Sequence, residues 1–167
     1  MKQPEIRELP PKKLVGIKIT NTLANNQVRS LWKSFMPRRD EVVNRAGKDL
    51  YSVQQYHKDF SMEQFNPDTE FTQWAAVQVD DWPHIPEGMD KLLLTGGVYA
   101  VFLHKGPASR YPETHKYIYG AWLPGSKYSL DFRPHFEILS EGYLGPDHPD
   151  SEEEVWIPVI EHHSPAK

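Results

Sequence analysis

Glu137 is the residue whose surroundings point most directly to chemistry, because it stands among apolar residues in the segment HFEILSE at 135–141. Side chains of a β-strand alternate between the two faces of a sheet, so Phe136 and Ile138 share one face, and Glu137 shares the other with His135. If Phe136 and Ile138 pack against helices, Glu137 faces the open side. A carboxylate in an aromatic cleft loses hydration unless it is paired. Such a group attracts a cationic ligand or acts as a general acid or base with a raised pKa. The plainer alternative is a solvated glutamate on an exposed strand face.

Aromatic residues are the other unusual feature, with five Trp, eight Tyr and seven Phe. These residues bury large areas, and a wall of them holds a flat or cationic ligand through stacking and cation–π contacts of about 0.5 to 2 kcal/mol each. The candidates that we expect beside Glu137 are Tyr51, Trp74, Tyr99, Trp122 and Tyr128. Taken singly, each of them is more commonly a residue of the hydrophobic core.

Two stretches 86 positions apart repeat the same apolar spacing of i, i+3, i+4, i+7 and i+8, which lines up one face of a helix. The first contains Val28, Leu31, Trp32, Phe35 and Met36, and the second contains Thr114, Tyr117, Ile118, Ala121 and Trp122. Strand-like segments flank both, so the chain reads twice as strand, helix, strand, strand, with pseudo-repeats at about 12–80 and 91–160. At the offset of Glu137 the first copy has Tyr51. An acid and an aromatic residue are therefore expected to meet across the internal symmetry axis.

The predicted fold is α+β, with two pseudo-twofold-related β-α-β-β modules, an antiparallel sheet, two helices on one face and a central ligand groove. Strands are expected at 14–19, 50–57, 71–79, 91–106, 135–141 and 155–160, and helices at 26–38 and 112–122. Pro37 predicts an irregular end for the first helix, and Pro158 predicts an edge or a bulge in the last strand. The glycines at 96–97 predict a bend. Because 98–103 is entirely apolar, both faces of that strand should be covered, and helices can cover only one.

Length and composition bound the function. With 167 residues, 38% of them hydrophobic, the chain is expected to form a single domain over 1–167. The net charge of −4 provides no basic stripe, so no direct nucleic-acid binding is expected. The absence of cysteine excludes a thiolate nucleophile and agrees with a reducing compartment. Neither a signal peptide nor an apolar run of membrane-spanning length is evident, so we expect a cytoplasmic protein without membrane contact.

Metal and cofactor motifs are weak or missing. The eight histidines form no HExxH motif, and the acidic run at 147–154 lacks the alternating ligands of a calcium loop. His104 and His135 fall on strands, where a hydrogen-bonded structural histidine is the commoner outcome. Neither a glycine-rich phosphate loop nor a GxSxG motif occurs. We expect no metal and no cofactor.

Four segments carry a family resemblance: FLHKG at 102–106, WLPGSKY at 122–128, PHFEIL at 134–139, and VWIPV at 155–159 after an acidic loop. In this order they resemble the GyrI-like small-molecule-binding domain, which is the effector-binding domain of AraC-type and MerR-type multidrug regulators. The resemblance implies two strand-helix-strand-strand modules around a groove. It also implies aromatic groove walls and a buried glutamate that meets cationic, lipophilic compounds. By its position in the motif, Glu137 matches that glutamate.

The sequence departs from the regulators because it contains no helix-turn-helix segment, which indicates a stand-alone member. Three functions remain open: a binding or sequestering protein for lipophilic, cationic small molecules; a hydrolase of reactive cyclopropane-bearing compounds that uses Glu137 as general acid or base; and a gyrase-inhibitor-like interaction protein. Whether the chain is an enzyme is thus left open, as is a homodimer whose second chain completes the groove. Haem-binding relatives of the fold are disfavoured, because no histidine is clearly cleft-facing.

Overall fold

Nine strands form one antiparallel system in residues 2–162, the part of the chain that the computed structural model describes. Positions 1 and 163–167 of the predicted domain lie outside the described residues. In chain order the strands are β1 (Glu5–Leu9), β2 (Lys12–Asn21), β3 (Arg45–Gln55), β4 (Phe71–Val79), β5 (Asp90–Leu94), β6 (Gly97–Lys105), β7 (Tyr128–Leu130), β8 (His135–Leu139) and β9 (Glu152–Glu161). The helices are α1 (Val28–Phe35) and α2 (Tyr111–Tyr117).

The strand order β1-β6-β9-β8-β3-β4-β2-β5 displays the predicted duplication. One module is β2-α1-β3-β4 and the other is β6-α2-β8-β9, and the two meet where β3 pairs antiparallel with β8. Strands β5 and β1 extend the two outer edges, on β2 and β6 respectively. The predicted α+β fold with two β-α-β-β modules is confirmed.

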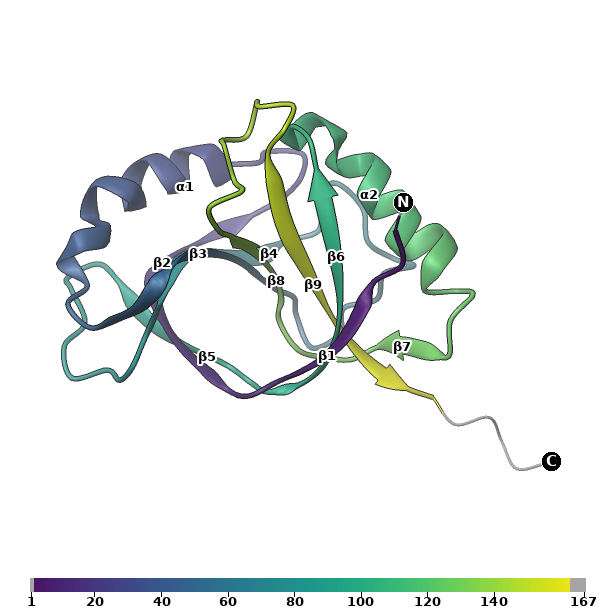
Figure 1. The fold of residues 1–167 in the computed structure, drawn as a ribbon, viewed down its shortest axis with the longest axis horizontal. Coiled ribbons are helices and arrows are strands. Elements are labelled where there is room, and N and C mark those ends of the chain that lie inside the picture. Colours follow the sequence, from purple (N-terminus) through teal and green to yellow (C-terminus); the bar gives the residue numbers. More distant parts are fainter. Residues whose placement is uncertain (1, 163–167) are drawn as a thin grey trace.

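The sheet is curled, and α1 and α2 both lie on its outer side (Figure 1). The inside of the curl holds a core to which no described helix contributes: Leu9, Leu14, Tyr51, Val53, Trp74, Ala76, Leu92, Leu94, Tyr99, Val101, Phe136, Ile138 and Trp156. This explains how the apolar stretch 98–102 of β6 is covered on both faces. Tyr99 and Val101 face the inside of the curl, whereas Ala100 and Phe102 pack beneath the α2 region. The sheet thus covers its own second face by curling.

Each helix buries a narrow apolar stripe on the outer face. Leu31 and Phe35 of α1 pack on β2 and β4, and Ile118, directly after α2, packs on β6 and β9. Helix α1 ends at Phe35 and continues as a 3₁₀ turn, Met36–Glu41, that contains Pro37. The irregular end predicted from this proline is confirmed. Helix α2 likewise passes into a π-helical turn at Ile118–Trp122.

The predicted strand at 91–106 is in fact two strands, β5 and β6, which pair at opposite edges of the sheet. The break spans Thr95 and Gly96, and β6 begins at Gly97, whose φ of +142° is rarely adopted by L residues. Strand β1 was missed because its EIREL sequence is mostly exposed and has no apolar alternation. Pro158 falls between the stretch of β9 that pairs with β8 and the stretch that pairs with β7, where a missing N–H is tolerated.

Candidate functional site

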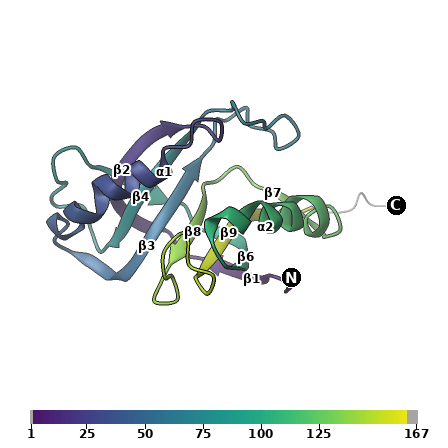
Figure 2. The same ribbon diagram turned by 90° about the horizontal axis from the view of Figure 1, so that it is seen from above.

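Glu137 lies on the outer face of the sheet, the face that carries the helices. Viewed from above, β3 and β8 run through the gap between α1 and α2 (Figure 2). Phe136 and Ile138 turn into the core inside the curl, so the condition under which Glu137 would face the open side, that these two residues pack against helices, is not met. The alternation of side chains along β8 was predicted correctly. The apolar side of β8, however, packs inside the curl and not against a helix, so Glu137 points to the face that carries the helices. It lies on the strip between the helices and remains partly exposed.

A network of amides surrounds the Glu137 carboxylate. Gln54 of β3 donates from Nε2 to Glu137 Oε1 at 3.3 Å, and the same nitrogen is 3.2 Å from Gln73 Oε1. Gln73 Nε2 in turn donates to Ser52 Oγ at 2.9 Å. Ser52 is also the residue directly opposite Glu137 in the β3–β8 register. The carboxylate is thus held by neutral donors rather than by a counter-charge.

A second carboxyl group, Glu153 of β9, shares this face. Val155 is the register partner of Glu137, and Glu153 lies two residues before it, as a diagonal neighbour on the adjacent strand. Burial raises the pKa of Glu153 to about 7. Burial, followed by the charge of Glu153, raises the pKa of Glu137 well above the usual glutamate range, and the Gln54 hydrogen bond offsets this only in part. Among the described residues, no lysine or arginine contributes to either shift.

Three tyrosines lie near enough to Glu137 for its charge to affect them. Burial raises the pKa values of Tyr56, Tyr111 and Tyr119, and the charge of Glu137 raises each of them further. Sequence reasoning missed all three. A signal for two of them existed, because Tyr111 and Tyr119 are eight residues apart on either side of His115, and the spacing of four forms a second stripe along α2. The surroundings of Glu137 are therefore aromatic, although not through the residues that we predicted.

His135 closes one end of this region. Its Nδ1 lies 3.1 Å from the Tyr119 hydroxyl, and its ring packs edge-on against Tyr56. Burial, with smaller contributions from His115 and Arg133, lowers the pKa of His135 to about 3, so this histidine is neutral at physiological pH. The Tyr56 ring also stacks on Phe60 with the ring centres 4.2 Å apart.

The structure separates the five predicted aromatic residues from Glu137. Tyr51, Trp74 and Tyr99 lie inside the curl, on the opposite face of the sheet. Trp122 and Tyr128 lie on the outer face but stack on one another at the end of the α2 region. The 86-residue repeat matches Glu137 with Tyr51, but the β3–β8 register places Ser52, and not Tyr51, opposite Glu137. An offset of one residue moves a side chain to the other face of a strand.

The predicted structural role of His104 and His135 agrees with the hydrogen bonds that both residues make. A cavity of about 500 Å³ lies among the described residues, and Glu137 is absent from its lining. His104 is a buried structural histidine that lies 2.6 Å from Thr114 Oγ1 and 3.2 Å from the Pro107 carbonyl oxygen. Within 2–162, no group of three or more His, Cys, Asp or Glu residues is arranged to hold a metal ion. No helix in that range is long and apolar enough to cross a membrane.

The chain is similar to known proteins over nearly all of the described residues. The protein-family model of the GyrI-like small molecule binding domain matches residues 2–160 of this chain. The transcriptional regulator BrlR of Pseudomonas aeruginosa is 27% identical over 155 residues, which are 92% of this chain and 54% of the regulator. The chain thus spans about half the length of this curated relative.

Two solved structures have a similar fold. SAV2435, solved with bound tetraphenylphosphonium, superposes with a TM-score of 0.68 at 19% identity, covering 95% of this chain and 94% of that one. The C-terminal domain of EcmrR superposes with a TM-score of 0.70 at 14% identity, covering 96% of this chain and 98% of that one.

Proposed function

The chain belongs to the GyrI-like small-molecule-binding domain family, and on that premise we propose that it binds lipophilic cations at Glu137, between α1 and α2. The observation that carries the proposal is the pair of Glu137 and Glu153, two carboxyl groups with raised pKa values and no basic partner among the described residues. An ionised carboxylate in such surroundings has lost hydration without gaining a counter-ion. A ligand cation supplies that counter-ion where water screens the attraction only weakly.

The surroundings favour a lipophilic cation over a small hydrated one. Tyr56, Tyr111 and Tyr119 lie close enough to Glu137 for its charge to raise their pKa values, and a cation over an aromatic ring gains about 0.5 to 2 kcal/mol. A delocalised organic cation leaves water at a lower cost than a compact ammonium ion does. Glu137 is partly exposed, so such a ligand can reach it from solvent. The binding of tetraphenylphosphonium by SAV2435, which has the same fold, supports this class of ligand.

Calorimetric titration with tetraphenylphosphonium tests the proposal. Glu137→Gln keeps the shape of the side chain and removes its charge, and we expect affinity to fall at least tenfold, or about 1.4 kcal/mol. Glu154→Gln is the matched control, because Glu154 is on β9 but pairs with Ile138 and faces the other side of the sheet. Neutral triphenylphosphine oxide should bind more weakly than the phosphonium does. Equal affinity of the parent and Glu137→Gln for the cation would refute the proposal.

Hydrolysis of reactive xenobiotics is the second candidate, with Glu137 as general acid or base. Burial raises the pKa of Glu137 well above the usual glutamate range, and a carboxyl group that holds its proton to higher pH suits acid–base catalysis. Chromatography of a cyclopropane-bearing electrophile distinguishes the two functions. Loss of the compound with the parent and its persistence with Glu137→Gln would support the enzyme. A gyrase-inhibitor-like interaction protein, by contrast, would tolerate Glu137→Gln.

A further inference from the structure

The cavity of about 500 Å³ lies where the ends of three strands meet. Gln55 ends β3, Thr95 follows β5, and the segment 130–135 leads into β8. The segment 60–62, which follows β3, contributes a further side. Tyr56 and His135 line the cavity and also border the Glu137 region, whereas neither Glu137 nor Glu153 lines it. The cavity is therefore a separate chamber with its own chemistry, and its size suits a drug-sized molecule.

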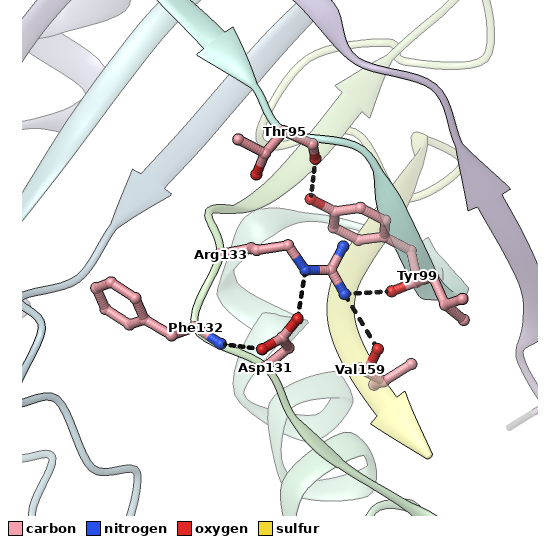
Figure 3. Close-up of polar contacts among 7 residues, drawn as sticks. Thr95, Tyr99, Asp131, Phe132, Arg133 and Val159 are labelled. Atoms are coloured by element: carbon pink, nitrogen blue, oxygen red, sulfur yellow. Dashed lines mark hydrogen bonds and ion pairs between the residues drawn. The ribbon is translucent and has the colours of Figure 1, made fainter.

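The one cationic side chain in its lining is already compensated. Arg133 donates from Nε to Asp131 Oδ2 at 2.7 Å, and from Nη2 to the carbonyl oxygens of Val98 at 2.7 Å and Val159 at 3.0 Å (Figure 3). Its guanidinium also lies 4.6 Å from the centre of the Tyr99 ring. Arg133 and Asp131 thus neutralise each other and are fixed in place.

The remaining titratable groups leave the cavity uncharged. Burial lowers the pKa of His135 to about 3, so it carries no charge at neutral pH. Burial raises the pKa of Tyr56, so its hydroxyl stays protonated. Unlike the Glu137 region, the cavity has no carboxylate free to attract a cation, and this favours a neutral occupant.

Apolar side chains and unpaired hydrogen-bond donors in the lining indicate further properties of a ligand that would fit the cavity. The Tyr56 and Phe60 rings stack face to face, and at the rim Phe132 is 62% exposed and points away from the Arg133–Asp131 pair. Gln55 Oε1 accepts a hydrogen bond from Trp74 Nε1 at 2.6 Å, which orients the amide and leaves its NH₂ group as a donor.

Several polar groups in the lining are available to donate to a ligand, and one of them is Arg133 Nη1, which is buried without a hydrogen-bond partner among the described residues. Among the hydrogen bonds of residues 2–162, none is donated by the Gln55 amide or by the hydroxyls of Ser61 and Thr95. An acceptor group on a ligand would satisfy such donors.

We propose that this cavity is a second binding site, for a neutral, flat, lipophilic small molecule that carries a hydrogen-bond acceptor. The site differs from the proposed cation site because it uses neither Glu137 nor a charged ligand, although Tyr56 borders both. Stacking on the Tyr56–Phe60 face and contact with Phe132 supply affinity, and the donors of Ser61, Thr95 and Gln55 orient the acceptor.

Nile red, a neutral, flat dye with a carbonyl acceptor, is a suitable probe because its emission rises in apolar surroundings. We expect the parent to bind one dye per chain. Thr95→Trp fills the cavity from an exposed position and should weaken binding at least tenfold. Ser61→Trp fills it from the segment after β3 and should have the same effect, so the test survives the misfolding of either variant.

Two controls separate this site from a sticky surface and from the cation site. Phe132→Ser should weaken dye binding, whereas Leu103→Ser, which removes an exposed apolar side chain outside the cavity lining, should not. Glu137→Gln should leave dye affinity unchanged, and tetraphenylphosphonium should not displace the dye. Failure of the parent to bind Nile red, equal loss in the Phe132 and Leu103 variants, or one-for-one displacement by the cation would overturn the inference. A protein that binds the dye but not the cation would contradict the proposed function alone.

Discussion

The affinity for a lipophilic cation should increase with pH, because the raised pKa values of Glu137 and Glu153 keep these two acids protonated at a higher pH than ordinary glutamates. Burial raises the pKa of Glu153 to about 7 and raises that of Glu137 as well. Below these pKa values the pair is protonated, and a cation has to displace a proton to bind. Above them the site is already anionic.

The magnitude follows from proton linkage. If binding releases one proton from the Glu137–Glu153 pair, the association constant rises up to tenfold, or about 1.4 kcal/mol, for each pH unit below the pKa of the pair. The other groups near Glu137 should not contribute. Tyr56, Tyr111 and Tyr119 have raised pKa values and stay protonated, and His135 is neutral.

Calorimetry with tetraphenylphosphonium from about pH 6 to about pH 9 tests this linkage, and repeating it in buffers of different ionisation enthalpy counts the protons released. Glu153→Gln removes the charge that raises the pKa of Glu137, so the rise in affinity should move to lower pH. Glu137→Gln should bind weakly and with little pH dependence. A pH-independent affinity in the parent, or an unchanged slope in Glu137→Gln, would refute the reasoning.

Three further predictions concern stability. Because folding raises the pKa of Glu137, its protonated form contributes stability below the usual glutamate pKa, and this contribution is lost as pH rises through the folded pKa. Urea unfolding of the ligand-free protein should therefore show a smaller alkaline loss in Glu137→Gln than in the parent, and equal losses would contradict the pKa shift. Phe35→Ala should reduce the unfolding free energy by about 3 to 5 kcal/mol because Phe35 is fully buried beneath α1, whereas Leu103→Ala, at a 47% exposed position, should change it by less than about 1 kcal/mol. Gly97→Ala should lower the thermal midpoint, because φ is +142° and the new Cβ would meet the Arg133 side chain; an unchanged midpoint would show that Arg133 can move away.

The sequence was informative where a local pattern corresponds to a local structure. The spacing of Leu31 and Phe35 predicts the buried stripe of α1, and Pro37 predicts its irregular end, since helical period and proline geometry act within a few residues. The curl of the sheet is a property of many strands together, and no single segment encodes it. For that reason the alternation along β8 was predicted correctly, whereas the face toward which Glu137 points was not.

The internal repeat was a reliable guide to topology and an unreliable guide to partners. It predicts two modules from an apolar pattern that recurs 86 positions later, and an error of one or two positions in that distance leaves the predicted topology unchanged. Identifying the residue opposite Glu137 requires the register itself. The β3–β8 pairing assigns Ser52 to that place, and Tyr51 faces the other side.

The departure from symmetry at the β3–β8 pair has a consequence for the chemistry. An acid at position 52 would stand directly opposite Glu137, and the repulsion between the two carboxylates away from water would keep one of them protonated. Here the module of β3 contributes the neutral Ser52, and the second acid, Glu153, comes from β9 of the same module as Glu137. The amides of Gln54 and Gln73 on the β3–β4 side complete a neutral hydrogen-bonding wall. One module therefore carries the charge that a cation requires, and the other supplies neutral groups that hold the carboxylate without compensating its charge.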